Sequence, residues 1–357
     1  MSIIDILKSF FSRKPQQKLL PEGRNNIVER DVNTSNDFKN NLQYDVKKNP
    51  TLIEPDFKEC VEEYIKQYAI QEEIKSKAKI YHSFIRMFCD NEESSGNNKK
   101  NQEKLNDKIK KSGYQTAFQM SGNRCIYMHI SGEKGLDEYK NRDMEKIYLN
   151  CERKNIALLT SKIFDEIKGI TGDKLQMKCI SEQFLKEGEK QEENAKIKNY
   201  QRNEKIVIYA ENHEMAEKIA EKINQIRINN PELFSGNKTL PFMQKKYGVM
   251  GIGVKKIYEY AKTPLGEVTG KTYNEYIANL LYTCIIAGFD KEMGVDENNK
   301  ESLEERMGIY SKLYSKMSTE QKASVMGNIK KTYEEVTKEN NISTVYSKQS
   351  TDITIEK

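Results

Sequence analysis

The clearest pattern in this chain is a series of short alternating segments separated by amphipathic helices. In each alternating segment, apolar and polar residues take turns, which is typical of a strand with one buried face. Apolar residues recur at helical spacing over 153–169 and 212–227. This rhythm of strands and helices predicts an α+β fold with a small central β-sheet flanked by helices. Strands are expected at 124–130, 146–151, 175–180 and 205–209.

Helical patterns also lie on both sides of the sheet region. One or two helices are expected from Pro55 to about Phe88, and a short polar helix at 102–111. Beyond Pro231 glycine and proline make the chain irregular, before helical spacing returns. The later helices are expected at 271–288, 300–315 and 319–338. The expected organisation is a disordered or loosely ordered N-terminal arm at 1–54, a helical segment at 55–112, an α+β core at 113–290, C-terminal helices at 291–340 and a disordered tail at 341–357.

Three segments allow more than one interpretation. Residues Ser2–Phe11 can form a short helix that docks on a membrane or a partner, or they can be a frayed terminus. The charged span 187–203 can be an exposed helix or a mobile lid. The helices at 300–338 can bind a partner, although covering one face of the sheet is the preferred interpretation.

Composition excludes several classes of protein. The chain has 59 basic and 54 acidic residues mixed along its length, so it has no extended basic face and nucleic acid is not expected as a partner. Its six cysteines include no C-x-x-C pair, which favours a reducing compartment over disulfides or a zinc site. No run reaches the roughly 20 apolar residues that span a bilayer, so no integral membrane segment is expected.

A glycine-rich motif at Gly248–Gly253 invites comparison with dinucleotide-binding loops. Such a loop has a third glycine three residues further on, where this chain has Lys256. No cofactor is therefore expected. The spacing of the cysteines gives no reason to expect a metal either.

Cationic side chains gather on the predicted strands. Lys146 and Lys178 lie within strands, and Arg202 lies in the loop before the next strand. A guanidinium can grip phosphate oxygens in a two-pronged contact, while a lysine can hold a point charge or act as a base when neighbouring cations lower its pKa. These residues predict a phosphate-handling site. The alternative is that the lysines form the solvent side of a half-exposed sheet.

The motifs also follow one another in an order that resembles one known family. A strand with Tyr127 and His129 is followed by Lys-Ile-Tyr-Leu-Asn at 146–150, by Met-Lys at 177–178, and by Arg202 just before Ile-Val-Ile-Tyr at 206–209. This order resembles the HopA family of bacterial type III effectors. Proteins similar to that family also occur as lyase components of lanthipeptide synthetases, and the fold is akin to that of phosphothreonine lyases. The resemblance covers roughly 120–290.

The resemblance implies a β-elimination site. Lys178 would be the base that removes the α-proton of a phosphothreonine or phosphoserine, and Lys146 and Arg202 would hold the leaving phosphate. Tyr148 stands where the lyases present a histidine. A tyrosine with a pKa near 10 is a poorer acid than histidine, but a cationic pocket would lower that pKa.

His129 offers another solution, because Tyr-Met-His-Ile-Ser at 127–131 also resembles the Lys-x-His-x-Ser strand of the lyases, with Tyr127 in place of the lysine. The two alignments exclude each other, and the Lys146 strand is preferred because Lys178 and Arg202 then follow in the family order. The chain also lacks the family's arginine at the start of a later helix, and Lys271 is the residue that could substitute for it.

The resemblance therefore implies a bacterial effector that is secreted into the host cell cytoplasm. It would act on or bind a phosphorylated host protein, and a secretion chaperone is a further expected partner. The alternative is a catalytically inactive protein–protein interaction module that keeps the same fold.

Overall fold

The structure is a computed structural model, and it describes residues 56–71, 76–89, 96–121, 124–134, 144–181, 203–234, 242, 244–246, 250–255, 260–270, 272–295 and 301–342. The expected N-terminal arm, including Ser2–Phe11, lies outside this part of the chain, as do all but two residues of the expected C-terminal tail. The charged span lies outside it as well, apart from Asn203.

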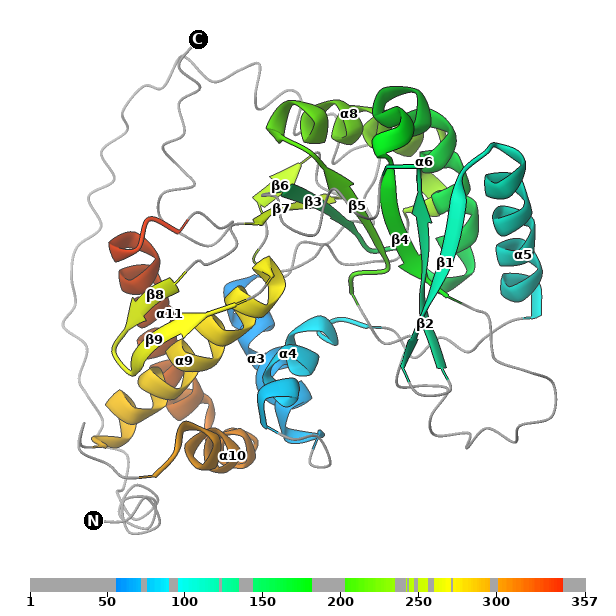
Figure 1. The fold of residues 1–357 in the computed structure, drawn as a ribbon. Coiled ribbons are helices and arrows are strands. Elements are labelled where there is room, and N and C mark those ends of the chain that lie inside the picture. The colour runs from blue at the N-terminus through cyan, green and yellow to red at the C-terminus, as the bar shows by residue number, and fades with distance from the viewer. Residues whose placement is uncertain are drawn as a thin grey trace, which may run out of the picture.

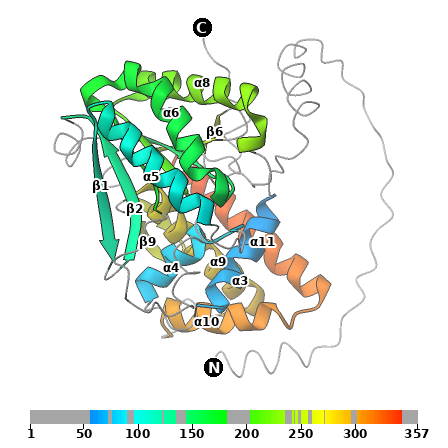
Figure 2. The ribbon, with the colours of Figure 1, turned by 90° about the vertical axis from the view of Figure 1, so that its right-hand side faces the viewer.

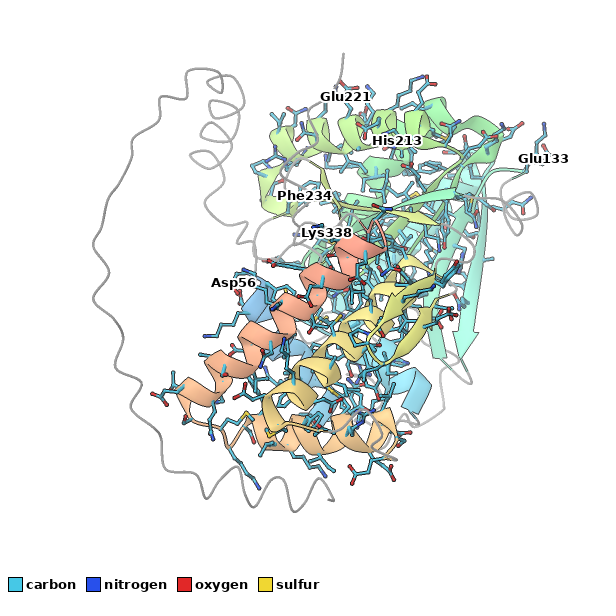
Figure 3. All side chains as sticks on the ribbon, turned by 90° about the vertical axis from the view of Figure 1, so that its left-hand side faces the viewer. Asp56, Glu133, His213, Glu221, Phe234 and Lys338 are labelled. Atoms are coloured by element: carbon cyan, nitrogen blue, oxygen red, sulfur yellow. The ribbon has the colours of Figure 1, made fainter. Side chains whose placement is uncertain are left out.

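One half of the molecule is a helical bundle (Figure 1). Helix α3 buries residues at helical spacing, from Phe57 to Tyr68, and begins at Asp56, whose side chain accepts a hydrogen bond from the Glu59 backbone. Figure 3 shows α11 running alongside α9, with Asp56 near α11. The bundle therefore brings the two ends of the described chain together. It consists of α3 (Phe57–Ala69), α4 (Ser76–Ile85), α9 (Tyr273–Met293), α10 (Leu303–Tyr314) and α11 (Thr319–Glu339).

Helix α9 is the centre of this bundle. Its buried residues lie on all sides of the helix, because α4, α10 and α11 pack around it and its first turn faces the sheet. At Gly288 the α11 backbone comes so close that a Cβ atom there would lie 2.4 Å from Ile329 Cγ1 and 2.7 Å from the Ile329 backbone nitrogen. Glycine is therefore required where the two helices cross.

Replacing Gly288 by alanine is expected to lower the free energy of unfolding by about 1–3 kcal/mol, because the added methyl group forces α9 and α11 apart. Gly327→Ala in α11 is the matched control, since a Cβ atom added at Gly327 would have no neighbouring atom within 4 Å. There alanine is expected to raise the free energy of unfolding by about 0.5–1 kcal/mol. Urea unfolding of both variants measures the difference, and equal stabilities would contradict this account of the crossing.

The other half is built on an antiparallel sheet, and the described residues form seven strands of it in the order β1-β2-β4-β5-β3-β7-β6. A separate hairpin pairs β8 with β9 and packs on α9. The strands are β1 (Gln115–Ser121), β2 (Arg124–Ser131), β3 (Met144–Leu149), β4 (Gln176–Ile180), β5 (Ile206–Ala210), β6 (Gln244–Lys246), β7 (Met250–Lys255), β8 (Tyr260–Thr263) and β9 (Gly266–Thr269).

Within the described part of the chain, three helices cover one face of this sheet (Figure 2). They are α5 (Gly96–Lys111), α6 (Ile156–Thr171) and α8 (His213–Asn229), and short 3-10 turns occur at Arg153–Asn155, Gly172–Lys174 and Pro231–Leu233. The alternation along each strand places one set of apolar residues under these helices, among them Ile147, Met177 and Ile208. The residues between them therefore point to the opposite face.

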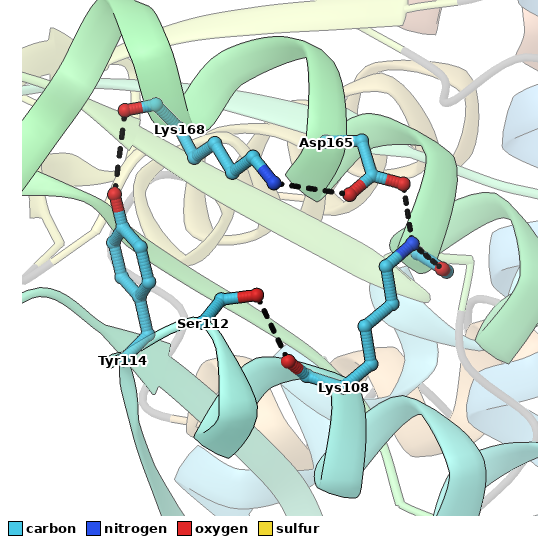
Figure 4. Close-up of polar contacts among 6 residues, drawn as sticks. Lys108, Ser112, Tyr114, Asp165 and Lys168 are labelled. Carbon is cyan, nitrogen blue, oxygen red and sulfur yellow. Dashed lines mark hydrogen bonds and ion pairs between the residues drawn. The ribbon is translucent and has the colours of Figure 1, made fainter.

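Polar contacts join α5 to α6 at the outer surface (Figure 4). Lys108 forms an ion pair with Asp165, and its ammonium group also donates to Ser161 Oγ at 2.8 Å. The Tyr114 hydroxyl group donates to the Lys168 carbonyl oxygen at 3.4 Å. Because the ion pair is about 40% exposed, it contributes only about 0–1 kcal/mol to stability. Burial of the apolar face of α6 stabilises this layer far more.

The predicted α+β class is confirmed, with helices in the N-terminal and C-terminal parts of the described chain. The four predicted strands lie within two residues of the observed β2, β3, β4 and β5. The pattern did not reveal β1, or β7 in the glycine-rich segment at 250–255. The preferred role of the helices at 300–338 was wrong, because α10 and α11 pack on α3 and α9, and it is the start of α9 that lies against the sheet.

Candidate functional site

The candidate site lies on the sheet face opposite α5, α6 and α8. Backbone pairing places His129 of β2 opposite Lys178 of β4, Lys178 opposite Val207 of β5, and Val207 opposite Tyr148 of β3. These four residues form one row across the sheet. Side chains that are directly paired in antiparallel strands lie on the same face, so the row projects toward the bundle side.

The row brings Lys178 and His129 together as direct neighbours. Tyr148 is separated from Lys178 by β5, which corresponds to two strand spacings or roughly 10 Å. Lys146 belongs to the next row, where it pairs with Tyr209. His129 and Tyr148 are the key residues of the two alternative alignments with the lyases. The structure places both of them on one face of one sheet.

Two of the predicted phosphate-binding residues, Arg202 and Lys271, lie outside the described residues. Their assignment stays a prediction.

Lys178 rests on an aromatic ring. Its ammonium nitrogen lies 3.9 Å from the centre of the Tyr127 ring, a distance at which the ring quadrupole attracts the cation. Lys146 has a longer contact of the same kind, 5.3 Å from the Tyr209 ring centre. Tyrosine rings therefore hold both predicted cations on the site face.

His129 is held as a neutral imidazole. Burial and, as the smaller cause, the Lys178 ammonium together lower its pKa from 6.5 to about 4. Its Nε2 atom lies 3.1 Å from Gln119 Oε1, and since a carboxamide oxygen only accepts, Nε2 carries the hydrogen in this contact. Nδ1 is buried and, within the described residues, makes no hydrogen bond.

Replacing Lys178 by glutamine is expected to raise the pKa of His129 from about 4 partway toward 6.5, because the cation is removed while the burial remains. The measurement is an NMR titration of the imidazole, with Lys110→Gln on the outer helix α5 as the control. A pKa near 6.5 in the wild type would contradict the buried setting.

The same shift makes stability depend on pH. As the pH falls, His129 of the unfolded chain, with a pKa near 6.5, binds a proton at a higher pH than His129 of the folded protein. The contribution of His129 to stability is therefore present above about pH 6.5 and is lost as the pH falls toward 4.

Tyr148 lies in a different environment from the one expected. Its side chain is only 2% exposed, and burial raises its pKa well above the usual value, with the Glu204 carboxylate raising it further. The expectation that a cationic pocket lowers this pKa was therefore wrong. Tyr148 is a neutral phenol packed against Val207 and the partly buried Tyr273.

Glu204, which no sequence pattern indicated, lies at the centre of the polar contacts on this face. The residue is 4% exposed, and its Oε1 accepts from the Tyr81 hydroxyl group at 2.8 Å and from the Tyr127 hydroxyl group at 3.3 Å. Its Oε2 accepts from Asn274 Nδ2 at 2.7 Å. One carboxylate therefore joins α4, β2 and α9 to the residues just before β5. A single acidic residue in a charged loop gave no sequence signal for this role.

The described part of the chain has no group of three His, Cys, Asp or Glu side chains that could hold a metal ion. Among the described helices, none is both long enough and apolar enough to cross a membrane.

The fold and this face define an α+β protein with a lysine, a histidine and several tyrosines gathered on one side of an antiparallel sheet. No protein-family model matches the chain, and no curated protein matches it. Among solved structures, the chain is similar to an effector protein from Pseudomonas syringae pv. syringae strain 61, with 10% identity and a TM-score of 0.40. It is also similar to an effector protein from Pseudomonas syringae pv. tomato strain DC3000, with 14% identity and a TM-score of 0.41. Each comparison covers 70% of this chain and 89% of the other.

Proposed function

We propose that this protein is a bacterial effector that eliminates phosphate from phosphothreonine or phosphoserine residues of a host protein. The observation that carries the proposal is the direct pairing of Lys178 with His129 on one sheet face. An amine and an imidazole side by side supply the two proton transfers that β-elimination requires. The resemblance of the motifs between 120 and 290 to HopA effectors supports delivery into a host cell.

In the proposed reaction, the Lys178 ammonium first passes its proton to His129, because the bound phosphate dianion makes the imidazole more basic. The resulting neutral amine of Lys178 then takes the α-proton of the phosphorylated residue. The electrons of the broken C–H bond form a double bond between Cα and Cβ, and the bond between Cβ and the phosphate oxygen breaks. His129 protonates the leaving phosphate, and the products are a dehydroamino acid residue and inorganic phosphate. Lys146 balances the charge of the phosphate, together with Arg202 and Lys271.

The geometry favours His129 over Tyr148 as the proton donor. His129 is the cross-strand neighbour of Lys178, whereas Tyr148 is buried two strands away. A neutral His129 is converted into an acid by the substrate itself, because a bound phosphate dianion raises the pKa of a neighbouring imidazole.

One observation favours a second function, a phosphopeptide-binding module without turnover. The buried Glu204 carboxylate lies on the same face, hydrogen-bonded to the tyrosine that contacts Lys178. The carboxylate and the ring face beside Lys178 both favour its charged ammonium form, which can hold a phosphate but cannot accept a proton. In this alternative Glu204 is part of a structural network, and Lys178 and Lys146 only hold phosphate.

The test is intact-mass analysis of phosphothreonine and phosphoserine peptides incubated with the protein. Loss of phosphoric acid, leaving a dehydroamino acid that adds a thiol, is the expected result. Phosphotyrosine peptides are the matched control, because their phosphate is on an aromatic ring and cannot leave by this elimination. Hydrolysis to free threonine would contradict a lyase, and binding with an unchanged peptide mass would support the non-catalytic module.

A further inference from the structure

Tyr127 contacts both members of the proposed catalytic pair. The Lys178 ammonium nitrogen lies 3.9 Å from its ring centre, and the His129 ring meets the Tyr127 ring edge to face, with centres 6.4 Å apart. Tyr127 precedes His129 by two positions in β2, so both side chains project from the same face. Its ring is therefore a platform beside the pair.

Hydrogen bonds hold the hydroxyl end of the Tyr127 side chain in place. The Tyr127 hydroxyl group donates to Glu204 Oε1, which also accepts from Tyr81, while Asn274 donates to the other carboxylate oxygen. Tyr127 is 2% exposed and Asn274 is 1% exposed, so these contacts are shielded from water. Buried hydrogen bonds of this kind restrict the ring to one orientation.

We infer that Tyr127 is a positioning residue that holds the Lys178 ammonium beside His129, and that Glu204 acts through Tyr127 by fixing its ring. A lysine amine sits on a flexible stem of four carbons, and without a restraint it samples several rotamers. The electron-rich ring face selects the rotamers that keep the amine next to the imidazole. The catalytic consequence of this inference rests on the proposed function, but the positioning itself does not.

The test replaces Tyr127 by phenylalanine and by phenylalanines with one, two and three ring fluorines. Fluorine withdraws electrons from the ring face and weakens its attraction for a cation, while the shape of the ring changes little. The readout is the pKa of His129 from NMR, assigned with His129→Gln among the three histidines of the chain. Because the nearby ammonium lowers this pKa, we expect it to rise step by step from about 4 as fluorines are added.

A pKa that stays constant along the series would overturn the inference, since a merely structural ring would not respond to fluorination. Fluorinated tyrosines at the same position keep the hydroxyl group on Glu204, and the same stepwise rise is expected if the phenylalanine variants fail to fold. With an active enzyme, kcat is expected to fall along the series while KM stays unchanged. An inactive wild type would refute the proposed lyase but leave the titration result intact, so the two failures are distinguishable.

Discussion

Replacing Lys178 by alanine is expected to reduce the rate of phosphate elimination from phosphothreonine peptides by about 10²–10⁴-fold. This is the usual contribution of a positioned general base. The residue occupies the centre of the row, paired with His129 on one side and Val207 on the other. No other residue of this row carries an amine, so the α-proton would have no acceptor at that place. The rate of phosphate release measures the effect.

Two further variants separate the role of the amine from that of its charge. Lys178→Arg keeps a cation but cannot act as a base, because a guanidinium stays protonated. We expect it to bind the phosphopeptide and not to turn it over. Lys110→Ala, in the exposed outer surface of α5, is the control and should leave the rate unchanged. Full activity of Lys178→Ala would remove this residue from the mechanism, and another group would then have to act as the base.

Replacing Asp290 by alanine is expected to lower the free energy of unfolding by about 3–5 kcal/mol. Asp290 of α9 forms an ion pair with Arg306 of α10 and accepts a hydrogen bond from the Tyr310 hydroxyl group at 2.6 Å. Both charged residues are 8% exposed. Without the carboxylate, the buried guanidinium loses the charge with which it is paired.

Urea unfolding of Asp290→Ala measures this effect. The matched control is Glu335→Ala, which breaks an exposed ion pair with Lys331 and should change the free energy of unfolding by about 0–1 kcal/mol. The double variant Asp290→Leu with Arg306→Met is expected to recover most of the loss, because an apolar pair leaves no buried charge. If Asp290→Ala were as stable as its control, solvent would have to reach the Arg306 side chain.

Local patterns of apolar and polar residues predict most of the strands and helices of this protein. Alternation over five to eight residues predicts which face of β2, β3, β4 and β5 is apolar, since side chains of a strand point to alternate faces. The helices of the bundle follow from apolar residues three and four positions apart. Strand β7 was missed because its two glycines, Gly251 and Gly253, indicate a loop when only neighbouring residues are considered.

Amino-acid sequence alone thus determined the fold class, the apolar faces of most elements and the presence of a lysine and a histidine on strands. The tertiary structure decided which of these residues meet. It inserts β5 between β3 and β4, so that Lys178 pairs with His129 and not with Tyr148. It also places Glu204 against Tyr81 and Tyr127, which are 123 and 77 positions away in the chain. Periodicity depends on neighbours within a few residues, whereas strand order and register depend on pairing between distant segments, and a local pattern carries no information about that pairing.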